Sequence, residues 1–186
     1  TGEGGALLTN DASLYWQAYL LRKHGIDRND KMFIEKERIG SWIYDMEALG
    51  FNYRLTDFQA ALGLSQLKKI DRFKARRRKI VDYYNEQFSD IEELILPYES
   101  ENVNSNFHLY ILQVKDNPSF DRFDLFSYLK GKNYQPMVLY IPVHLLGYYR
   151  KRYGYKRGDF PVSEKFYDRS LAIPLYPSLT DSEVEK

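Results

Sequence analysis

The chain has 186 residues, of which 27 are basic and 26 acidic, and its formal net charge at pH 7 is +1. This balance gives no reason to expect nucleic acid as a partner, because proteins that bind it carry a clustered basic surface. The absence of cysteine excludes disulfides, thiolate metal sites and a cysteine nucleophile, and it fits a cytoplasmic protein. No apolar run approaches the ~20 residues of a membrane-spanning helix, so we expect no membrane contact.

The chain opens on a glycine cluster, residues 2–5, and a short apolar run, residues 6–9, that predicts a buried strand. The cluster is interpreted either as a phosphate cradle or as a flexible turn that lets a neighbouring backbone approach closely. A helix should follow, beginning near Asn10 or Asp11 and stopping at Gly25. Its apolar positions at one-face spacing are Leu14, Ala18 and Leu21.

Residues 26–53 show weaker periodicity and predict a long loop or a hairpin, a kind of segment that is often functional inside a compact domain. Charged residues alternate there with Met32, Phe33, Ile34, Trp42, Ile43 and Tyr44.

One helix is predicted from Thr56 to about Phe88, because this stretch has no proline and repeats apolar residues at helical spacing. Its first turns are apolar nearly all round, so we expect that end to be buried. A helix of this length spans roughly 50 Å and should bridge two domains or a subunit contact. The basic run at residues 74–79 is interpreted as a solvated helix face. The apolar stripe comprises Leu67, Ile70, Phe73, Ile80, Tyr84 and Phe88.

Beyond residue 100, strands and helices alternate as in a compact α+β unit. We expect strands at residues 107–114 and 137–141, a helix at residues 120–130, short helices near residues 145–152 and 162–171, and an extended piece at residues 172–175. Thr180 and Glu183 form the pattern of a capping box that opens a helix with only three residues left to build it. Together with the missing initiator methionine, this suggests that the chain is a piece of a longer protein.

Asn52 and Arg54 are the foremost candidate site residues. Side chains two apart on an extended segment point the same way, so an amide and a guanidinium should project together toward a helix N-terminus, where a phosphate or carboxylate binds readily. The competing interpretation is structural: Thr56 and Gln59 form a capping box, and Asp57 already neutralises the helix end.

Two histidines are candidate site residues. Neither is expected to belong to a metal site, because the three histidines of the chain are too scattered in the sequence. His108 lies on a predicted apolar strand. There it is more often a core residue whose polar atoms are hydrogen-bonded than a catalyst. His144 lies at a predicted strand end, where functional residues concentrate, and the structural and functional interpretations are balanced there.

Several segments together resemble one family, the pyridoxal-phosphate-dependent nucleotide-sugar aminotransferases of the DegT/StrS type. The resemblance rests on the opening GEGGA, the TND that follows it, and residues 50–63, which read GFNYRLTDFQAALG. Weaker support comes from the QLKK that follows, the YIPVH ending at His144, and residues 171–175, which read LAIPL. The resemblance covers the whole chain but corresponds to the C-terminal half of a family member.

The resemblance implies a type I aminotransferase fold, α/β plus α+β. Residues 1–55 would end the cofactor-binding large domain, residues 56–89 would form a long connecting helix, and residues 90–186 a small C-terminal domain. Asn52 and Arg54 would reach across a homodimer interface toward the neighbouring subunit's cofactor phosphate or substrate. The Schiff-base lysine would lie upstream of Thr1, so that this chain alone would hold no catalytic residue and be inactive.

The resemblance also implies a substrate. The residues expected to line the sugar site are Asn52, His108, Met137, Val138, Leu139, Tyr140 and His144. Relatives often carry glutamine and histidine at the positions of Met137 and Leu139, which leaves the exact sugar open. The implied reaction moves an amino group from glutamate to C4 of a nucleotide-linked 4-keto-6-deoxy sugar for surface-sugar synthesis. The alternatives are a different keto-sugar, an aminocyclitol, or a non-catalytic aminotransferase-like partner.

Overall fold

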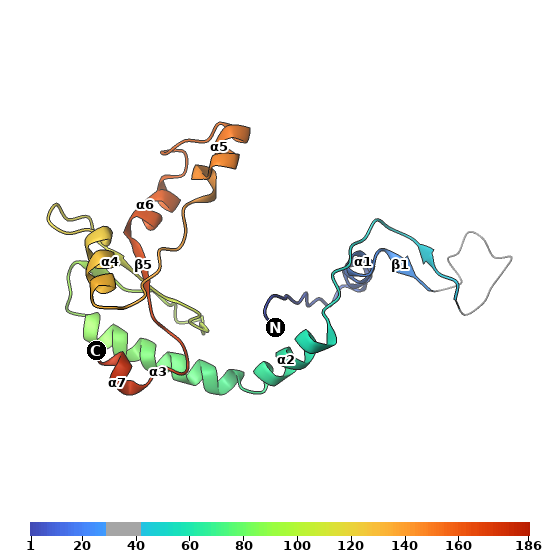
Figure 1. The fold of residues 1–186 in the computed structure, drawn as a ribbon, viewed down its shortest axis with the longest axis horizontal. Helices are drawn as coiled ribbons and strands as arrows, with labels where there is room; N and C mark the ends of the chain where they lie inside the picture. Colours follow the sequence, from blue (N-terminus) through green and yellow to red (C-terminus); the bar gives the residue numbers. More distant parts are fainter. Residues whose placement is uncertain (29–41) are drawn as a thin grey trace. The chain divides into compact units, whose positions relative to one another are not determined.

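The computed structural model describes residues 1–28 and 42–186, and it divides the chain into two compact units, Thr1–Lys69 and Ile70–Lys186. Figure 1 traces their elements along the chain. The domain limits predicted at residues 55 and 89 remain a prediction. Among the residues described, no helix combines the length and the apolar character needed to cross a membrane.

Unit 1 begins with a well-capped helix, α1, at Ala12–Arg22. Asp11 is its N-cap, as predicted, and its Oδ1 accepts hydrogen bonds from the backbone N–H groups of Ser13, at 2.8 Å, and Leu14, at 3.1 Å. The predicted apolar face is wrong, because Leu14 and Leu21 are exposed and Leu20 is the buried residue of the helix. A helix turns its buried side toward whatever packs against it, and that neighbour could not be placed from spacing alone.

Two short paired strands come after α1 in the chain. Strand β1, Ile26–Asp27, pairs antiparallel with β2, Asp45–Met46, within the segment predicted to be a long loop or a hairpin. Gly25 takes a left-handed φ of 68°, and a Cβ there would lie 1.6 Å from the carbonyl oxygen of Ala48. Only glycine fits this turn. The apolar residues predicted to matter at positions 32–34 lie outside the described residues.

Helix α2 spans Asp57–Leu67 and starts with the predicted capping box. The backbone N–H of Thr56 donates to Gln59 Oε1, at 3.0 Å, and the backbone N–H of Gln59 donates to Thr56 Oγ1, at 3.4 Å.

Two expectations for unit 1 are wrong. The strand predicted at residues 6–9 is absent, with Leu8 93% exposed, because no described segment of the unit pairs with this run. The first turns of α2 are not buried either, and Phe58 is 90% exposed. Apolar composition indicates that a surface has to be covered, but it does not say that the covering element belongs to the same unit.

The single helix predicted from Thr56 to Phe88 is two helices, since α3 begins afresh at Ile70 and runs to Phe88. At the junction the backbone N–H of Lys69 donates to the carbonyl of Gln66, at 2.9 Å, a tighter turn than the α-helical one. Lysine is a good helix former, so nothing in residues 68–69 signals this break.

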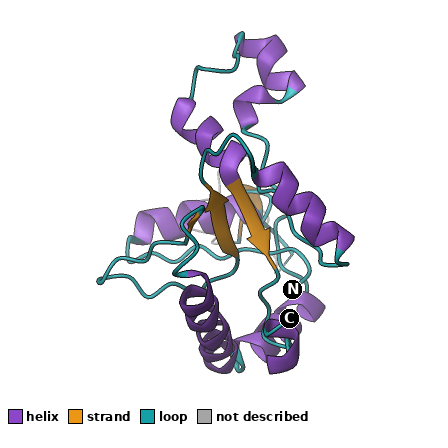
Figure 2. Cartoon of the chain, turned by 90° about the vertical axis from the view of Figure 1, so that its left-hand side faces the viewer, coloured by secondary structure: helices purple, strands orange, loops and turns teal. Residues whose placement is uncertain are grey.

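Unit 2 is built on a three-stranded antiparallel sheet of order β3-β4-β5. Its strands are β3 at Leu94–Ile95, β4 at Tyr110–Val114 and β5 at Ser170–Ile173. The helices are α4 at Arg122–Gly131, the 3-10 helix η2 at Val143–Leu145, α5 at Gly147–Tyr153, α6 at Pro161–Arg169 and α7 at Asp181–Val184. Figure 2 shows the strands and helices of the chain by colour. The α+β pattern predicted beyond residue 100 is therefore confirmed.

The core of unit 2 lies between α3 and the sheet. Ile80, Val81 and Tyr84 on α3 pack with Tyr110 on β4 and Leu171 on β5, all of them buried. Alternate residues of β4 are buried, as expected when one face of a strand meets a helix. The tyrosine hydroxyls keep partners, because Tyr84 donates to the carbonyl of Pro174, at 3.0 Å, and Tyr110 to Asn85 Oδ1, at 2.8 Å.

Two details of unit 2 differ from expectation. The strand predicted at residues 137–141 is reduced to one bridge between Met137 and Ala172 at the edge of β5. The basic run on α3 is only partly solvated, because Arg76 bonds to Asp181, at 2.6 Å, and Arg78 to Glu99, at 2.9 Å. Partners distant in sequence take up these guanidinium groups, which helical spacing alone does not reveal.

Candidate functional site

A cavity of about 690 Å³ lies within unit 1, between the glycine cluster, α1 and the segment that leads into α2. The side-chain amide of Gln59 ties two of these walls together, because its Nε2 donates to the backbone carbonyl of Glu3, at 3.1 Å. The lining residues are Glu3, Gly4, Gly5, Ala6, Leu7, Tyr15, Ala18, Tyr19, Arg22, Tyr53, Arg54, Leu55 and Gln59.

The charged groups of this cavity favour an anion. Arg22 and Arg54 are its two cations, and Glu3 is its one acid. Tyr19, one of the lining residues, contacts two cationic side chains. The Nζ atom of Lys23 bonds to the Tyr19 hydroxyl, at 2.7 Å, and the Arg22 guanidinium lies 5.6 Å from the centre of the Tyr19 ring. A guanidinium presents paired N–H donors that match a phosphate or a carboxylate. Arg54 was predicted from the sequence, whereas Arg22 was missed and had only its place in the last turn of α1 as a signal.

Asn52 and Arg54 do not share the cavity. Asn52 forms an antiparallel bridge with Lys23 and is exposed, but it is not among the lining residues, whereas its neighbours Tyr53 and Arg54 are. Residues 53–56 do not continue as a strand, so side chains two apart need not face the same way. The roles assigned to both residues remain predictions.

The capping box expected at the start of α2 is confirmed, whereas neutralisation of the helix end by Asp57 stays a prediction. The N–H of Gln59 at the N-terminus of α2 is used by Thr56, and Asp57 lies in the first turn. An anion near Arg54 would therefore depend on side chains and on the remaining free N–H groups of that turn.

The segment predicted to line the sugar site lies in unit 2, beside β5. Met137 and Tyr140 are exposed, Tyr140 at 73%, whereas Leu139 is buried and Val138 packs against the core. Tyr140 is thus the residue of this segment with an accessible hydroxyl. Met137 and Leu139 offer no polar contact.

The two candidate histidines lie in opposite environments. His108 precedes β4 and is exposed, so the expectation of a satisfied core residue is wrong. Strand β4 starts at Tyr110, three residues later than the start of the predicted strand. His144, in η2, is 8% exposed, and its Nε2 lies 2.8 Å from Oε1 of Glu164, which is itself buried. The Nε2 atom of His144 is therefore already hydrogen-bonded within the protein.

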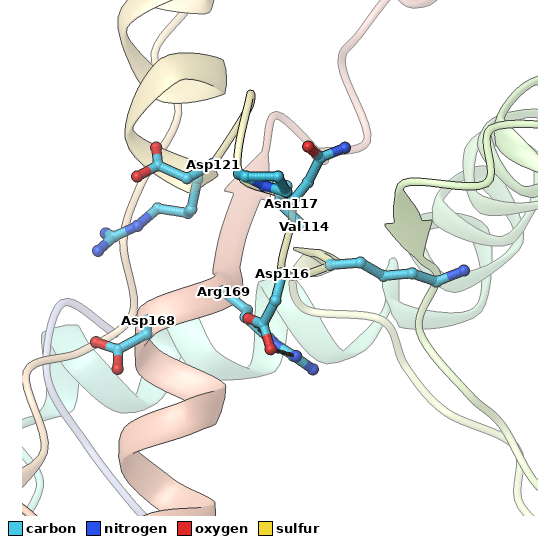
Figure 3. Close-up of a pocket in the computed structure, with 9 residues that line it drawn as sticks. Val114, Asp116, Asn117, Asp121, Asp168 and Arg169 are labelled. Carbon is cyan, nitrogen blue, oxygen red and sulfur yellow. Dashed lines mark hydrogen bonds and ion pairs between the residues drawn. The ribbon is translucent and has the colours of Figure 1, made fainter.

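A second cavity, of about 420 Å³, lies in unit 2 between the end of β4, the start of α4 and the end of α6 (Figure 3). Its acids already have partners. Arg169 donates to both carboxylate oxygens of Asp116, Arg157 bonds to Asp168, at 2.7 Å, and Asp121 caps α4. None of the residues predicted from the sequence to form a cofactor or substrate site lines this cavity.

The structure matches solved aminotransferases. The putative sugar aminotransferase Spr1654 from Streptococcus pneumoniae, in its PLP-form, superposes with a TM-score of 0.79 at 29% identity, covering 95% of this chain and 42% of that one. The chain therefore has the predicted type I aminotransferase fold. The model of the DegT/DnrJ/EryC1/StrS aminotransferase family matches residues 1–186, and the chain belongs to that family.

Two relatives carry informative names. The spore coat polysaccharide biosynthesis protein SpsC of Bacillus subtilis is 38% identical over 187 residues, covering 100% of this chain and 48% of that protein. The UDP-4-amino-4,6-dideoxy-N-acetyl-beta-L-altrosamine transaminase of Campylobacter jejuni is 31% identical over 179 residues, covering 96% of this chain and 44% of that protein. The chain thus spans about half the length of the relatives it matches.

Aminotransferases of this family use pyridoxal phosphate. The cavity of unit 1 fits the anionic part of that cofactor, because two guanidinium groups and the backbone of the glycine cluster line it. Among the described residues that line this cavity there is no lysine.

Proposed function

We propose that the full-length protein containing this chain is a pyridoxal-phosphate-dependent aminotransferase. It moves an amino group from glutamate to C4 of a nucleotide-linked 4-keto-6-deoxy sugar, for surface-polysaccharide or glycoprotein synthesis in the cytoplasm. The observation that carries the proposal is the family match over residues 1–186, joined to a relative named for a 4-amino sugar. The cationic cavity of unit 1 supports it independently, since both the cofactor and a nucleotide sugar carry phosphate.

Arg54 is assigned to a phosphate group, which its guanidinium can hold through two parallel hydrogen bonds. Asn52, exposed beside it in sequence, is assigned to the cofactor or the substrate of the neighbouring subunit in a homodimer. The apolar surface of α2 supports a dimer, because Phe58 and Leu62, one helical turn apart, are both exposed, and contiguous exposed apolar surface marks an interaction site.

Pyridoxal phosphate, when bound, supplies the electron sink for moving the amino group, and the protein supplies binding and orientation. On the substrate side we assign the accessible hydroxyl of Tyr140 to a hydrogen bond with the sugar. Met137, Val138 and Leu139 would shape the apolar wall of the site, and the exposed imidazole of His108 is a further candidate contact.

The test uses the full-length protein, glutamate and four acceptors: a UDP-linked and a dTDP-linked 4-keto-6-deoxy-hexose, a dTDP-linked 3-keto-6-deoxy-hexose and a keto precursor of an aminocyclitol. NMR of the product should show an amine at C4, with the UDP sugar preferred. An amine at C3 of a 3-keto sugar, as the name of the Aneurinibacillus thermoaerophilus relative suggests for that protein, would replace the substrate assignment but keep the reaction class. Absence of amine transfer to any keto-sugar or aminocyclitol precursor would favour the non-catalytic alternative.

A further inference from the structure

One carboxylate of unit 2 is buried and serves two segments at once. Glu164, in the first turn of α6, is 5% exposed, and its Oε1 lies 2.8 Å from Nε2 of His144. The same carboxylate accepts hydrogen bonds from the backbone N–H of Gly158, at 2.8 and 2.9 Å, and from that of Phe160, at 3.3 Å. A buried charged group normally exists only where such partners satisfy it.

These bonds define the loop between α5 and α6. Residues 154–160 have no regular secondary structure, and Gly158 takes a left-handed φ of 99° that points its N–H at the carboxylate. Burial raises the pKa of Glu164, but the hydrogen bonds from Gly158, His144 and Phe160 outweigh it and lower that pKa below its ordinary value. The group is therefore an ionised carboxylate at neutral pH.

Two aromatic rings contact His144. The ring centre of Phe160 lies 4.7 Å from that of His144, and the ring of Tyr155 lies edge-on at 6.4 Å. Tyr155 and Phe160 also contact each other, at 5.5 Å. Because both side chains are buried, the hydrogen bond between His144 and Glu164 is stronger than the same bond at the surface.

His144 ends the segment that carries Tyr140. Upstream, the segment is anchored at Met137, whose backbone exchanges two hydrogen bonds with Ala172 of β5, at 2.8 and 2.9 Å. Leu139 is buried just after this anchor, and His144 is buried at the far end. Tyr140 projects to solvent between the two fixed points. Its position therefore depends on the anchor at each end.

We propose that Glu164 is a positioning residue, which acts through His144 to hold the segment at residues 137–144, and with it Tyr140, in a substrate-binding position. This inference rests on the proposed function of Tyr140 as a sugar contact. In this proposal His144 supports the segment that carries Tyr140 and does not itself contact the sugar. The same carboxylate fixes the loop at residues 154–160, so that this loop and the Tyr140 segment are held together.

The structural arm of the test uses limited trypsin digestion of the full-length protein, with cuts after Lys156 and Arg157 located by mass spectrometry. Glu164→Gln should speed these cuts by about tenfold, because a buried amide cannot satisfy all the donors that now face a carboxylate. The matched control is Asp168→Asn, on the same helix. It removes the surface pair with Arg157, so the comparison uses the cut after Lys156, whose rate should change by less than about threefold. Equal rates in the two variants would overturn the proposal.

The functional arm separates positioning from simple destabilisation. In Glu164→Gln and His144→Ala the KM for the keto-sugar should rise about tenfold while the KM for glutamate stays unchanged, because only the sugar site is displaced. His144→Gln, whose amide nitrogen can replace the Nε2 donor, should restore most of the lost affinity. Unchanged KM for the sugar, or no rescue by His144→Gln, would overturn the proposal. If the wild-type protein transfers no amine, the proposed function fails, whereas the digestion result still decides whether Glu164 holds the loop.

Discussion

Arg78 and Glu99 link the middle of α3 to the loop after β3. Arg78 Nη2 donates to Glu99 Oε1, at 2.9 Å, and the same oxygen accepts the backbone N–H of Ser105, at 2.6 Å. The hydrogen bond from Arg78 lowers the pKa of Glu99 most, followed by that from Ser105, and the resulting pKa is about 2 rather than 4.5. A carboxyl group with a depressed folded-state pKa stabilises the fold when ionised.

This pair predicts a defined acid dependence. The contribution of Glu99 is fully present above pH 4.5 and is lost as the pH falls from there through about 2. Glu99→Gln should therefore lower the melting temperature at pH 7, and the difference from wild type should shrink steadily across that window. Glu101→Gln, at an exposed site of the same loop, is the control and should change little. A difference that stays constant down to pH 2 would rule out this linkage.

Arg54 gives a second prediction at the scale of single residues. In the full-length protein, Arg54→Ala should weaken binding of pyridoxal phosphate by about tenfold or more, because a charge-assisted phosphate contact is lost. Fluorescence titration with the cofactor measures this. Arg72→Ala, an exposed arginine of α3, keeps the net charge change the same and should leave the affinity unaltered. Equal affinities of the two variants would remove Arg54 from the phosphate site.

Among the elements, β5 contributes buried residues to the core of unit 2. Leu171 on this strand is fully buried against α3 and β4. Leu171→Ala should lower the free energy of unfolding by about 2–5 kcal/mol, through lost burial and the cavity left behind. Val162→Ala, on the exposed face of α6, should cost less than about 0.5 kcal/mol. Urea denaturation distinguishes these outcomes, and similar losses in both variants would mean that the core is placed wrongly.

Elements with local signals were predictable from the sequence. Asp11 and Thr56 cap their helices as their side chains suggested, and Gly25 marks the turn that only glycine fits. Where an outcome depended on distant neighbours, prediction failed. Residues 6–9 lack a pairing partner in the described chain, and the break at residues 68–69 has no helix-breaking residue.

The residues of the candidate site were likewise predictable only where the signal was local. Arg54 belongs to a recognisable motif, so the sequence was enough to select it. Arg22 joins the same cavity only because α1 folds back beside that segment. The partner of His144 could not be found by pattern either, since Glu164 lies 20 residues away on another helix and looks like an ordinary surface acid in the sequence.

At the scale of the whole molecule, the proposal places each cofactor site between two subunits. It predicts complementation between two inactive variants of the full-length protein, Arg54→Ala and a substitution of the upstream Schiff-base lysine. A mixed dimer then contains one site with both an intact lysine and an intact Arg54, so that co-expression should restore activity. Each variant expressed alone is the control. Persistent inactivity of purified mixed dimers would place both groups in one subunit.

The most direct test of the account separates the two halves of the proposed reaction. The full-length protein, loaded with cofactor, is incubated with isotope-labelled glutamate, freed of glutamate by gel filtration, and then given a UDP-linked 4-keto-6-deoxy-hexose. The account predicts that up to one labelled amine per active site appears at C4 of the sugar. Unlabelled or unaminated sugar, from protein that has demonstrably bound the cofactor, would contradict it.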